Sequence, residues 1–158
     1  MASIDWCMKQ KHGIEITAPN QNMAESYLEM AEESITVLSN IKKSNIWTAT
    51  TSYYIFYYSL YALMLKIGIK CEIHACSLEF MKQYLSEYYT REDVNMIEQS
   101  FGARINLQYY ANRVVDEETI DRCRGYCKDF FIKTKEILST ITDEQVQAIR
   151  TRIKTSHL

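Results

Sequence analysis

Glycine and proline are scarce in this sequence, which contains four glycines and one proline among its 158 residues. Sandwiches, barrels and other turn-rich sheet proteins need many more of both, because tight turns require the backbone angles that these residues adopt. The scarcity therefore disfavours a β fold and predicts long helices joined by short loops. The length predicts a single domain with one substantial core.

An excess of charge of either sign is also missing. Lysine and arginine total 18 and aspartate and glutamate total 20, for a net charge of −2. A protein whose whole surface follows nucleic acid would need a basic excess, so any such contact must be a local groove. A small basic cluster, Arg150, Arg152 and Lys154, is interpreted as a solvated helix end. With 47% hydrophobic and 24% charged residues, the composition is typical of a globular protein.

Cysteine occurs in an odd number, five, and the N-terminal stretch MASIDWCMKQ contains no apolar run of the kind that a targeting segment needs. We therefore expect reduced thiols in a cytoplasmic protein. A zinc site built from Cys71, His74 and Cys76 with Cys123 and Cys127 is conceivable, but neither group has the spacing of a CxxC pair. Cys123 and Cys127 also fall on a predicted core stripe, where cysteine behaves as a small apolar residue. The sequence thus predicts no metal ion and no cofactor.

An uncharged run, WTATTSYYIFYYSLYALML, covers residues 47–65 and is long enough to span a bilayer. It carries five tyrosines, however, and tyrosine prefers the membrane interface to the apolar centre. We predict instead a helix that ends at Gly68 and is buried at the centre of the fold or at a dimer seam, with no membrane contact. Stacking of these tyrosines on single-stranded nucleic acid is disfavoured, because residues 46–65 contain no lysine or arginine.

Apolar residues recur every three or four positions through most of the chain, which predicts a succession of helices. Residues 1–20 are expected to form an irregular lead with a strand-like piece at residues 14–17. Residues 21–141 are predicted to form a compact antiparallel bundle, and residues 142–158 a C-terminal helix that packs on it or extends from it. Capping residues and stripes indicate helix starts at Asn20 or Asn22, Asn45, Cys76, Thr90, Asp116 and Thr142. The fold class is thus all-α, with about five to six helices.

The segment GARINLQYYANR, residues 102–113, places Arg104 at the border of an apolar stripe that begins at Val94. On a helix, Gln108 lies one turn beyond Arg104, whereas Tyr109 lies roughly 140° away. An arginine at the edge of a core needs an anion or carbonyl groups, because its charge cannot be neutralised. Three interpretations remain open: an intramolecular ion pair, a contact across a dimer, and a phosphate ligand.

Histidine is rare, and of the three histidines only His74 lies away from the predicted ends of the chain. No GxSxG, HExxH, P-loop or dinucleotide-binding motif occurs in the sequence. We interpret His74 as a hydrogen-bonded structural residue, since nothing near it in the sequence supplies an acid–base partner.

Four segments occur in an order and spacing that resembles archaeal members of the HEPN (higher eukaryotes and prokaryotes nucleotide-binding) superfamily. They are AESYLEMAEESI, SYYIFYYSLYALMLKIGIKCEIH, RINLQYYANRVVDEE and CRGYCKDFFIKTKEIL. With the lead around DWC and GIEIT, the likeness runs from about residue 5 to residue 140. The resemblance implies a compact antiparallel helical bundle that forms a homodimer. It also implies a partnership with a minimal nucleotidyltransferase in toxin–antitoxin or defence pairs.

Active members of this superfamily are metal-independent endoribonucleases that carry an arginine and, about four to six residues later, a histidine. Arg104 matches the arginine, but Tyr109 stands at the histidine position, so His74 would have to supply acid–base chemistry from elsewhere. The candidate catalytic residues are therefore Arg104, Tyr109 and His74. The candidate residues for binding RNA or a nucleotide are Arg104, Asn106, Gln108, Tyr109 and Tyr110. The leading hypothesis is an HEPN-like domain that binds RNA or a nucleotide as a component of a toxin–antitoxin or defence pair, with endoribonuclease activity left open. The alternatives are a non-catalytic dimeric module that docks a minimal nucleotidyltransferase and a nucleotide-sensing regulator.

Overall fold

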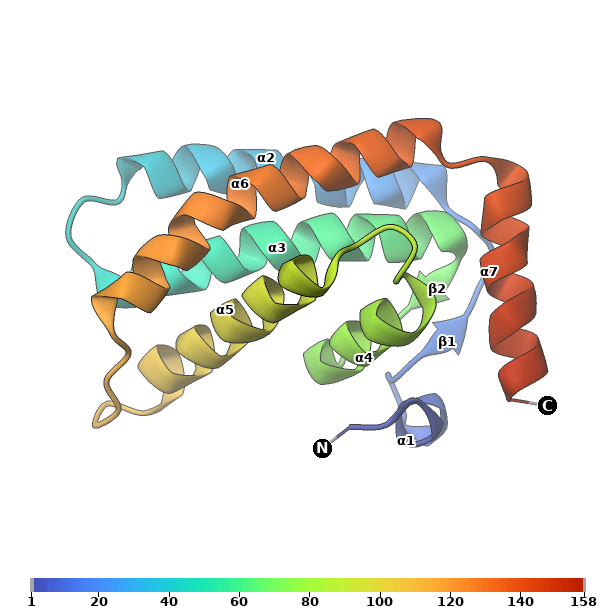
Figure 1. Ribbon diagram of the computed structural model, residues 1–158, viewed down its shortest axis with the longest axis horizontal. Helices are drawn as coiled ribbons and strands as arrows, with labels where there is room; N and C mark the ends of the chain where they lie inside the picture. The colour runs from blue at the N-terminus through green and yellow to red at the C-terminus, as the bar shows by residue number, and fades with distance from the viewer. Residues whose placement is uncertain (1, 158) are drawn as a thin grey trace.

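The computed structural model describes residues 2–157, and within them the fold is all-α, as the sequence predicts (Figure 1). The seven helices of this part of the chain are α1 (Ile4–Lys9), α2 (Gln21–Asn40), α3 (Asn45–Ile67), α4 (His74–Tyr84), α5 (Arg91–Tyr109), α6 (Glu117–Thr140) and α7 (Asp143–Ser156). The long helices α2, α3, α5 and α6 pack side by side, and each runs opposite to the one before it (Figure 1). The shorter helices α1, α4 and α7 lie toward the end of the bundle where α3 finishes (Figure 1).

Helix α3 occupies the centre of the bundle, where it contacts α2, α5 and α6. Sixteen of its 23 residues are buried, as expected for a helix with apolar side chains on nearly every face. Gly68 ends it in the left-handed conformation (φ 91°), as predicted, because glycine adopts that angle without steric cost. No helix within residues 2–157 combines the length and the apolar character that a bilayer-spanning segment needs.

Capping residues begin four of the helices where the sequence predicts them. The side chains of Asn20, Thr90, Asp116 and Thr142 each accept a hydrogen bond from the backbone N–H three residues further on. At Thr90 the reciprocal bond is present too, since the Asp93 carboxylate accepts from the Thr90 N–H at 2.7 Å. These caps satisfy backbone donors that have no partner inside a helix, and they confirm the predicted starts of α2, α5, α6 and α7.

The N-terminal lead contains a short strand within residues 14–17, as its sequence predicts, and also a helix that the sequence does not predict. Its residues form helix α1 and strand β1 (Glu15–Ile16), which pairs with strand β2 (Ile69–Lys70) in antiparallel register. Ser3 caps α1, and Ile4 and Cys7 bury the inner side of the helix against the core. A helix of six residues is too short to display a periodic apolar stripe, which is why sequence patterns do not indicate it.

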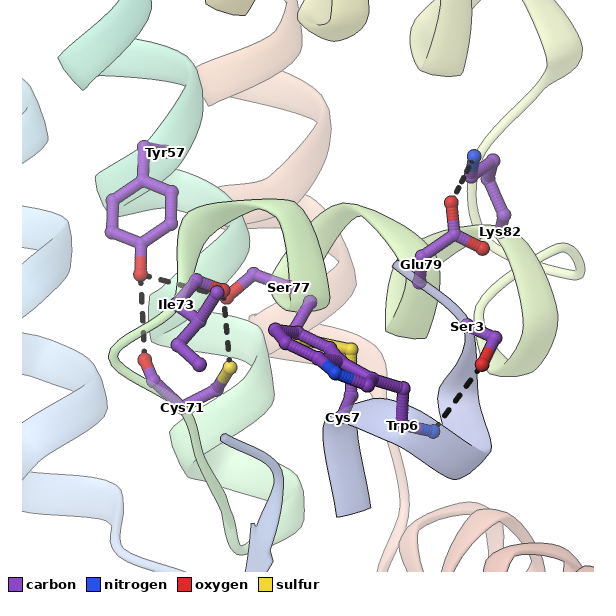
Figure 2. Close-up of a disulfide and its surroundings, with 10 residues drawn as sticks. Ser3, Trp6, Cys7, Tyr57, Cys71, Ile73, Ser77, Glu79 and Lys82 are labelled. Carbon is purple, nitrogen blue, oxygen red and sulfur yellow. Dashed lines mark hydrogen bonds and ion pairs between the residues drawn. A yellow bond between two sulfur atoms is a disulfide. The ribbon is translucent and has the colours of Figure 1, made fainter. Parts of the chain in front are cut away.

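A disulfide between Cys7 and Cys76 joins α1 to α4 (Figure 2). The expectation of reduced thiols throughout the chain is therefore wrong for these two residues. They lie 69 positions apart in sequence, and their Cα atoms come within 5.6 Å of each other because α1 packs on α4. Cys71, Cys123 and Cys127 are free thiols buried in the core, where they act as small apolar residues.

Arg150 attaches the C-terminal helix α7 to the bundle. Its Nη1 donates to the backbone oxygens of Thr17 at 2.8 Å and Ile67 at 2.9 Å, and it also contacts that of Gly68. These carbonyl groups belong to the N-terminal lead and to the end of α3, where a helix favours a positive charge. The interpretation of the basic cluster as a solvated helix end is therefore wrong for Arg150, which joins three distant segments of the chain.

Candidate functional site

Arg104 lies on the inner side of α5, with only 7% of its surface exposed. Its guanidinium is surrounded by aromatic rings. We call Arg104 and these rings, which belong to Tyr53, Tyr54, Phe101 and Tyr109, the Arg104 cluster. The guanidinium carbon lies 4.8 Å from the ring centre of Tyr53, 5.5 Å from Tyr54, 5.8 Å from Phe101 and 5.8 Å from Tyr109. Rings at these distances attract a cation through their quadrupoles, but they carry no net charge that would neutralise it.

The guanidinium has no anionic partner within residues 2–157. Its Nη1 donates to the hydroxyl of Tyr54 at 3.3 Å and to Oε1 of Gln108 at 3.4 Å, which are long and neutral bonds. The Nε atom is buried and makes no hydrogen bond to any group of the described residues. An intramolecular ion pair, one of the three interpretations of Arg104, is thus not formed with any carboxylate of the described chain. A buried charge in this state costs stability and favours any anion that reaches it.

The structure brings His74 to the Arg104 cluster, although 30 residues separate the two in sequence. His74 is the first residue of α4, and its ring stacks on Tyr57 with the centres 3.9 Å apart and the planes 10° from parallel. Its Nδ1 lies 2.8 Å from the hydroxyl of Tyr53, the ring that Arg104 covers. One tyrosine therefore connects the imidazole to the guanidinium, and no sequence motif indicates this contact.

The protonation state of His74 follows from these contacts. Burial, and secondly the positive charge of Arg104, lower the pKa of the imidazole from 6.5 to about 4, so the ring is neutral at pH 7. Burial also raises the pKa of Tyr53, whose hydroxyl keeps its proton and reaches no partner in the described chain other than Nδ1. Tyr53 therefore donates to Nδ1, and the imidazole carries its own proton on Nε2. In this form His74 offers a hydrogen-bond donor and is a weak base.

Two of the predicted binding residues lie apart from Arg104. The side-chain oxygen of Asn106 accepts a hydrogen bond from Nη1 of Arg113 at 2.8 Å. The same guanidinium covers the ring of Tyr110, with its carbon 3.5 Å from the ring centre. Asn106 and Tyr110 thus belong to an exposed group at the end of α5 that contacts a different arginine. Of the remaining predicted residues, those that gather around Arg104 are Gln108, Tyr109 and, through Tyr53, His74.

The conceivable zinc site does not assemble. Within residues 2–157 no three His, Cys, Asp or Glu side chains gather in a group that could hold a metal ion. Cys76 is consumed by the disulfide, and the thiol of Cys71 is directed at the backbone oxygen of Ile73, at 3.3 Å (Figure 2). Cys123 and Cys127 are buried on the core side of α6. The surroundings of these cysteines are therefore those of structural residues and not those of metal ligands.

A groove of about 690 Å³ lies beside the Arg104 cluster, between α2, α3 and the segment that joins β2 to α4. Tyr54 and His74 belong both to its wall and to the surroundings of Arg104. Tyr57 lines it too, with its hydroxyl 3.4 Å from the backbone oxygen of Cys71 (Figure 2). Core packing, the preferred interpretation of the α3 tyrosines, holds fully for Tyr57, whereas Tyr54 packs against the core and stays half-buried. We call this the tyrosine groove, after five of its lining residues: Tyr27, Tyr54, Tyr57, Tyr58 and Tyr61.

Comparison of the chain with models of protein families, with curated proteins and with solved structures finds no match in any of the three. The resemblance to the HEPN superfamily therefore stays a prediction from the residues quoted above. What the site does has to be inferred from the surroundings of Arg104, His74 and the tyrosine groove.

Proposed function

We propose that the protein is an HEPN-like domain that binds a phosphate group of RNA or of a nucleotide at Arg104. The observation that carries the proposal is a guanidinium that is buried without a carboxylate partner and has an unbonded Nε. Arginine presents parallel N–H donors that match two phosphate oxygens, and a charge-assisted pair of this kind would satisfy the buried donor. The Nε2–H of His74 supplies a second donor close by.

Binding has stronger support in the geometry than cleavage. A general base that removes the proton of a ribose 2′-hydroxyl works best with a pKa near the operating pH. The pKa of His74 is about 4, and at the position where active superfamily members have a histidine this chain has Tyr109, whose phenol is a poorer general base than an imidazole. We therefore expect RNA to be bound and, in the absence of metal, to be cleaved slowly if at all. Rapid appearance of 2′,3′-cyclic phosphate ends would contradict this part of the proposal.

Replacement of Arg104 tests the binding function. Fluorescence anisotropy with a short single-stranded RNA, at fixed ionic strength, should show that Arg104→Met weakens binding about tenfold to 100-fold, the loss of a charge-assisted pair. The matched control is Arg122→Met, because Arg122 is half-exposed on α6 and pairs with Glu118. It should change the affinity about twofold or less. Equal losses in the two variants would show that only the overall charge matters, and the site at Arg104 would be refuted.

The second candidate function is a non-catalytic module that forms a homodimer and docks a minimal nucleotidyltransferase in a toxin–antitoxin pair. It is favoured by two large apolar side chains near the turn between α2 and α3, since Val37 is 49% and Trp47 is 58% exposed. Trp47→Glu should then convert a dimer to a monomer in sedimentation velocity, or abolish a complex with a co-expressed nucleotidyltransferase, while RNA binding persists. A monomer in the unchanged protein that forms no such complex would eliminate this candidate.

Both proposals place the protein in the cytoplasm, where RNA and nucleotides are found. The disulfide between Cys7 and Cys76 would then have to persist in a reducing compartment, as it does in intracellular proteins of hyperthermophiles. Alkylation of protein in fresh cell extracts, followed by mass measurement, would count the free thiols. Three alkylated cysteines are expected, and five would show that the bond is absent in the cell.

A further inference from the structure

The tyrosine groove offers a ligand a surface of aromatic rings. On α3, Tyr54, Tyr58 and Tyr61 follow one another at helical spacing, so their side chains lie along one face. Tyr27 reaches them from α2, with its ring centre 5.9 Å from that of Tyr58 and 4.9 Å from that of Tyr61. Tyr27, Tyr54 and Tyr58 are only half-buried, so a ligand can touch their rings. The groove volume of about 690 Å³ lies within the range of small-molecule sites.

The hydroxyl of Tyr54 accepts a hydrogen bond from Arg104, and those of the other four groove tyrosines fall into two sets. Those of Tyr57 and Tyr61 are engaged with the backbone of Cys71, at 3.4 Å from its oxygen and 3.2 Å from its nitrogen. Those of Tyr27 and Tyr58 bond to no group of the described chain, although both side chains line the groove. The first set fixes the wall of the groove. The second set leaves polar groups that can contact the edge of a ligand, which a purely apolar ligand would not use.

Two exposed methionines extend the ring surface along α2. Met23 and Met30 lie one turn before and one turn after Tyr27, and both line the groove while keeping large exposed fractions. Thioether side chains make favourable contacts with aromatic rings and adjust to their outline. Apolar side chains left open to solvent over a groove of tyrosine rings are suited to cover a flat, aromatic ligand.

Charge determines which part of a ligand the groove accepts. Its charged side chains are Lys70 and Glu72, which lie 3.7 Å apart and offset one another. The groove therefore favours an uncharged group. Arg104 does not line it but lies one side chain away, since its Nη1 is 3.3 Å from the hydroxyl of Tyr54. A single ligand that satisfies both places must have a neutral planar ring and an anionic group joined to it.

We propose that the tyrosine groove is the base-binding half of a nucleotide site, in which the nucleobase stacks on the ring of Tyr58, the ring of Tyr27, tilted by 57°, contacts the edge of the base, and the phosphate contacts Arg104. This rests on the proposed function, because it assigns the charged half of the ligand to Arg104. It adds the place where the base of that ligand binds, whether the nucleotide is free or part of single-stranded RNA. Stacking on a tyrosine face is tolerant of base identity, so all four bases should bind.

The test compares probes with and without a base on the same variants. The probes are the four nucleoside 5′-monophosphates, ribose 5-phosphate, and a short RNA with its matched version that has abasic positions, all measured by calorimetry. The unchanged protein should bind each base-containing probe about tenfold or more tighter than its base-free match. The variants Tyr58→Leu and Tyr27→Leu should reduce this preference to about one, with the affinity for ribose 5-phosphate kept. Tyr58→Phe, which keeps the ring, should retain most of the preference.

Arg104→Met separates the two proposals. It should weaken the base-containing and the base-free probes by the same factor, because it removes the phosphate contact alone. A matched control is Tyr88→Leu, which alters a half-buried tyrosine outside the groove and should change neither affinity. Thermal unfolding of each variant shows whether the fold is kept. Where a leucine variant unfolds, two other measurements of the base preference are compared instead. One is made on Tyr58→Phe and Tyr27→Phe, and the other on variants in which Met23 or Met30 is replaced.

Each outcome has a consequence. An unchanged base preference in Tyr58→Leu and Tyr27→Leu overturns the groove as a base site, and a loss with Arg104→Met still upholds phosphate binding. A lost base preference with no effect of Arg104→Met upholds the groove and refutes the phosphate site. No binding of any probe at millimolar concentration refutes both. If the protein binds the RNA but not the monophosphates, and Tyr58→Leu abolishes the base preference for the RNA, the ligand is RNA and not a free nucleotide.

Discussion

The two ends of helix α5 carry one buried charge each, and the protein treats them differently. Near the start of the helix, Asp93 is 1% exposed and accepts hydrogen bonds from Lys133 at 2.6 Å, from Tyr126 at 2.7 Å and from the N–H of Thr90 at 2.7 Å. Near the other end, three helical turns on, Arg104 is 7% exposed and has no carboxylate partner in the described chain. One charge is fully matched by the fold and the other is not.

The difference indicates a structural role for one residue and a binding role for the other. Burial opposes ionisation of Asp93, but the bonds from Lys133, Thr90 and Tyr126 outweigh it and hold the pKa of the carboxyl below its usual range. Arg104 is compensated only by neutral partners, the surrounding rings and two long hydrogen bonds, so part of the cost of burying its charge remains. Residues that reduce stability in this way are characteristic of sites that complete themselves with a ligand.

The largest expected effect is that of removing the Cys7–Cys76 disulfide, which ties α1 to α4, the helix that begins with His74. The double variant Cys7→Ser/Cys76→Ser should lose about 4 kcal/mol in free energy of unfolding, the value expected for a closed loop of 69 residues. Urea denaturation of the variant and of the unchanged protein measures it. The control Cys123→Ala, which keeps the disulfide, should lose about 1 kcal/mol. Similar losses in both would mean that the disulfide contributes little.

Breaking the matched end of α5 should have the next largest effect. Asp93→Ala removes the acceptor of three hydrogen bonds, one of which is the reciprocal bond of the capping box, so it should lower the free energy of unfolding by about 3 kcal/mol. Asp121→Ala is the control, since this exposed carboxylate on α6 makes no hydrogen bond or ion pair in the described chain, and it should change stability by about 0.5 kcal/mol or less. A loss below about 1 kcal/mol in Asp93→Ala would show that the network is incidental.

Lowering the pH should affect stability at the two ends of α5 in different pH ranges. The pKa of His74 is lower in the folded chain, about 4 against 6.5, so the unfolded chain takes up its proton first as the pH falls. Stability should therefore be complete above pH 6.5 and decrease between pH 6.5 and 4. The expected loss is about 1 to 2 kcal/mol, less than the full shift, because the ring keeps contact with solvent. Asp93, with its lowered pKa, loses its contribution only at lower pH.

The variant His74→Asn, which cannot titrate and still accepts a bond from Tyr53, isolates this effect. Its stability should be flat over the same pH range, apart from small contributions of exposed groups. Inorganic phosphate bound at Arg104 should also raise the pKa of His74 in the unchanged protein, because it offsets the positive charge that lowers it. Nuclear magnetic resonance of the imidazole would measure the pKa of His74 with and without phosphate. A pKa that phosphate does not change argues against a shared site.

The smallest expected effect has the opposite sign. Arg104→Met replaces an unmatched buried charge by an apolar side chain of similar length, so the free energy of unfolding should rise by about 1 kcal/mol. A loss of more than about 1 kcal/mol would mean that the guanidinium holds the aromatic cluster together, and the contrast between the two ends of α5 would fail. Thermal denaturation in the absence of phosphate is the measurement.

Features that depend on neighbouring residues are the ones the sequence predicts. A helix cap joins residues three positions apart, so Asn20, Thr90, Asp116 and Thr142 indicate their helices without knowledge of the fold. The burial of α3 follows in the same way from its own composition. The predicted position of Arg104 at the edge of the core agrees with the structure, because the apolar stripe that indicates it is formed by neighbouring residues of the same helix.

The candidate site depends on contacts between distant residues, for which no local signal exists. The bond between His74 and Tyr53 joins positions 21 apart, and the contact between Arg104 and Tyr54 joins positions 50 apart. The disulfide, at 69 positions, is of the same kind. The tyrosine spacing on α3 was a usable signal for the groove, but an uncharged helix favours core packing, and only the position of α2 shows which rings stay accessible.

The central helix has a further consequence for how the protein is made. Helix α3 is complete at Ile67, but α6, which covers one of its faces, ends only at Thr140. At the usual rate of about 5 to 20 residues per second, the ribosome needs roughly 4 to 15 seconds to synthesise the intervening chain. During that time an apolar, tyrosine-rich surface is open on every nascent chain. Slow translation of this stretch should therefore increase aggregation, and chaperones that bind apolar nascent segments should reduce it.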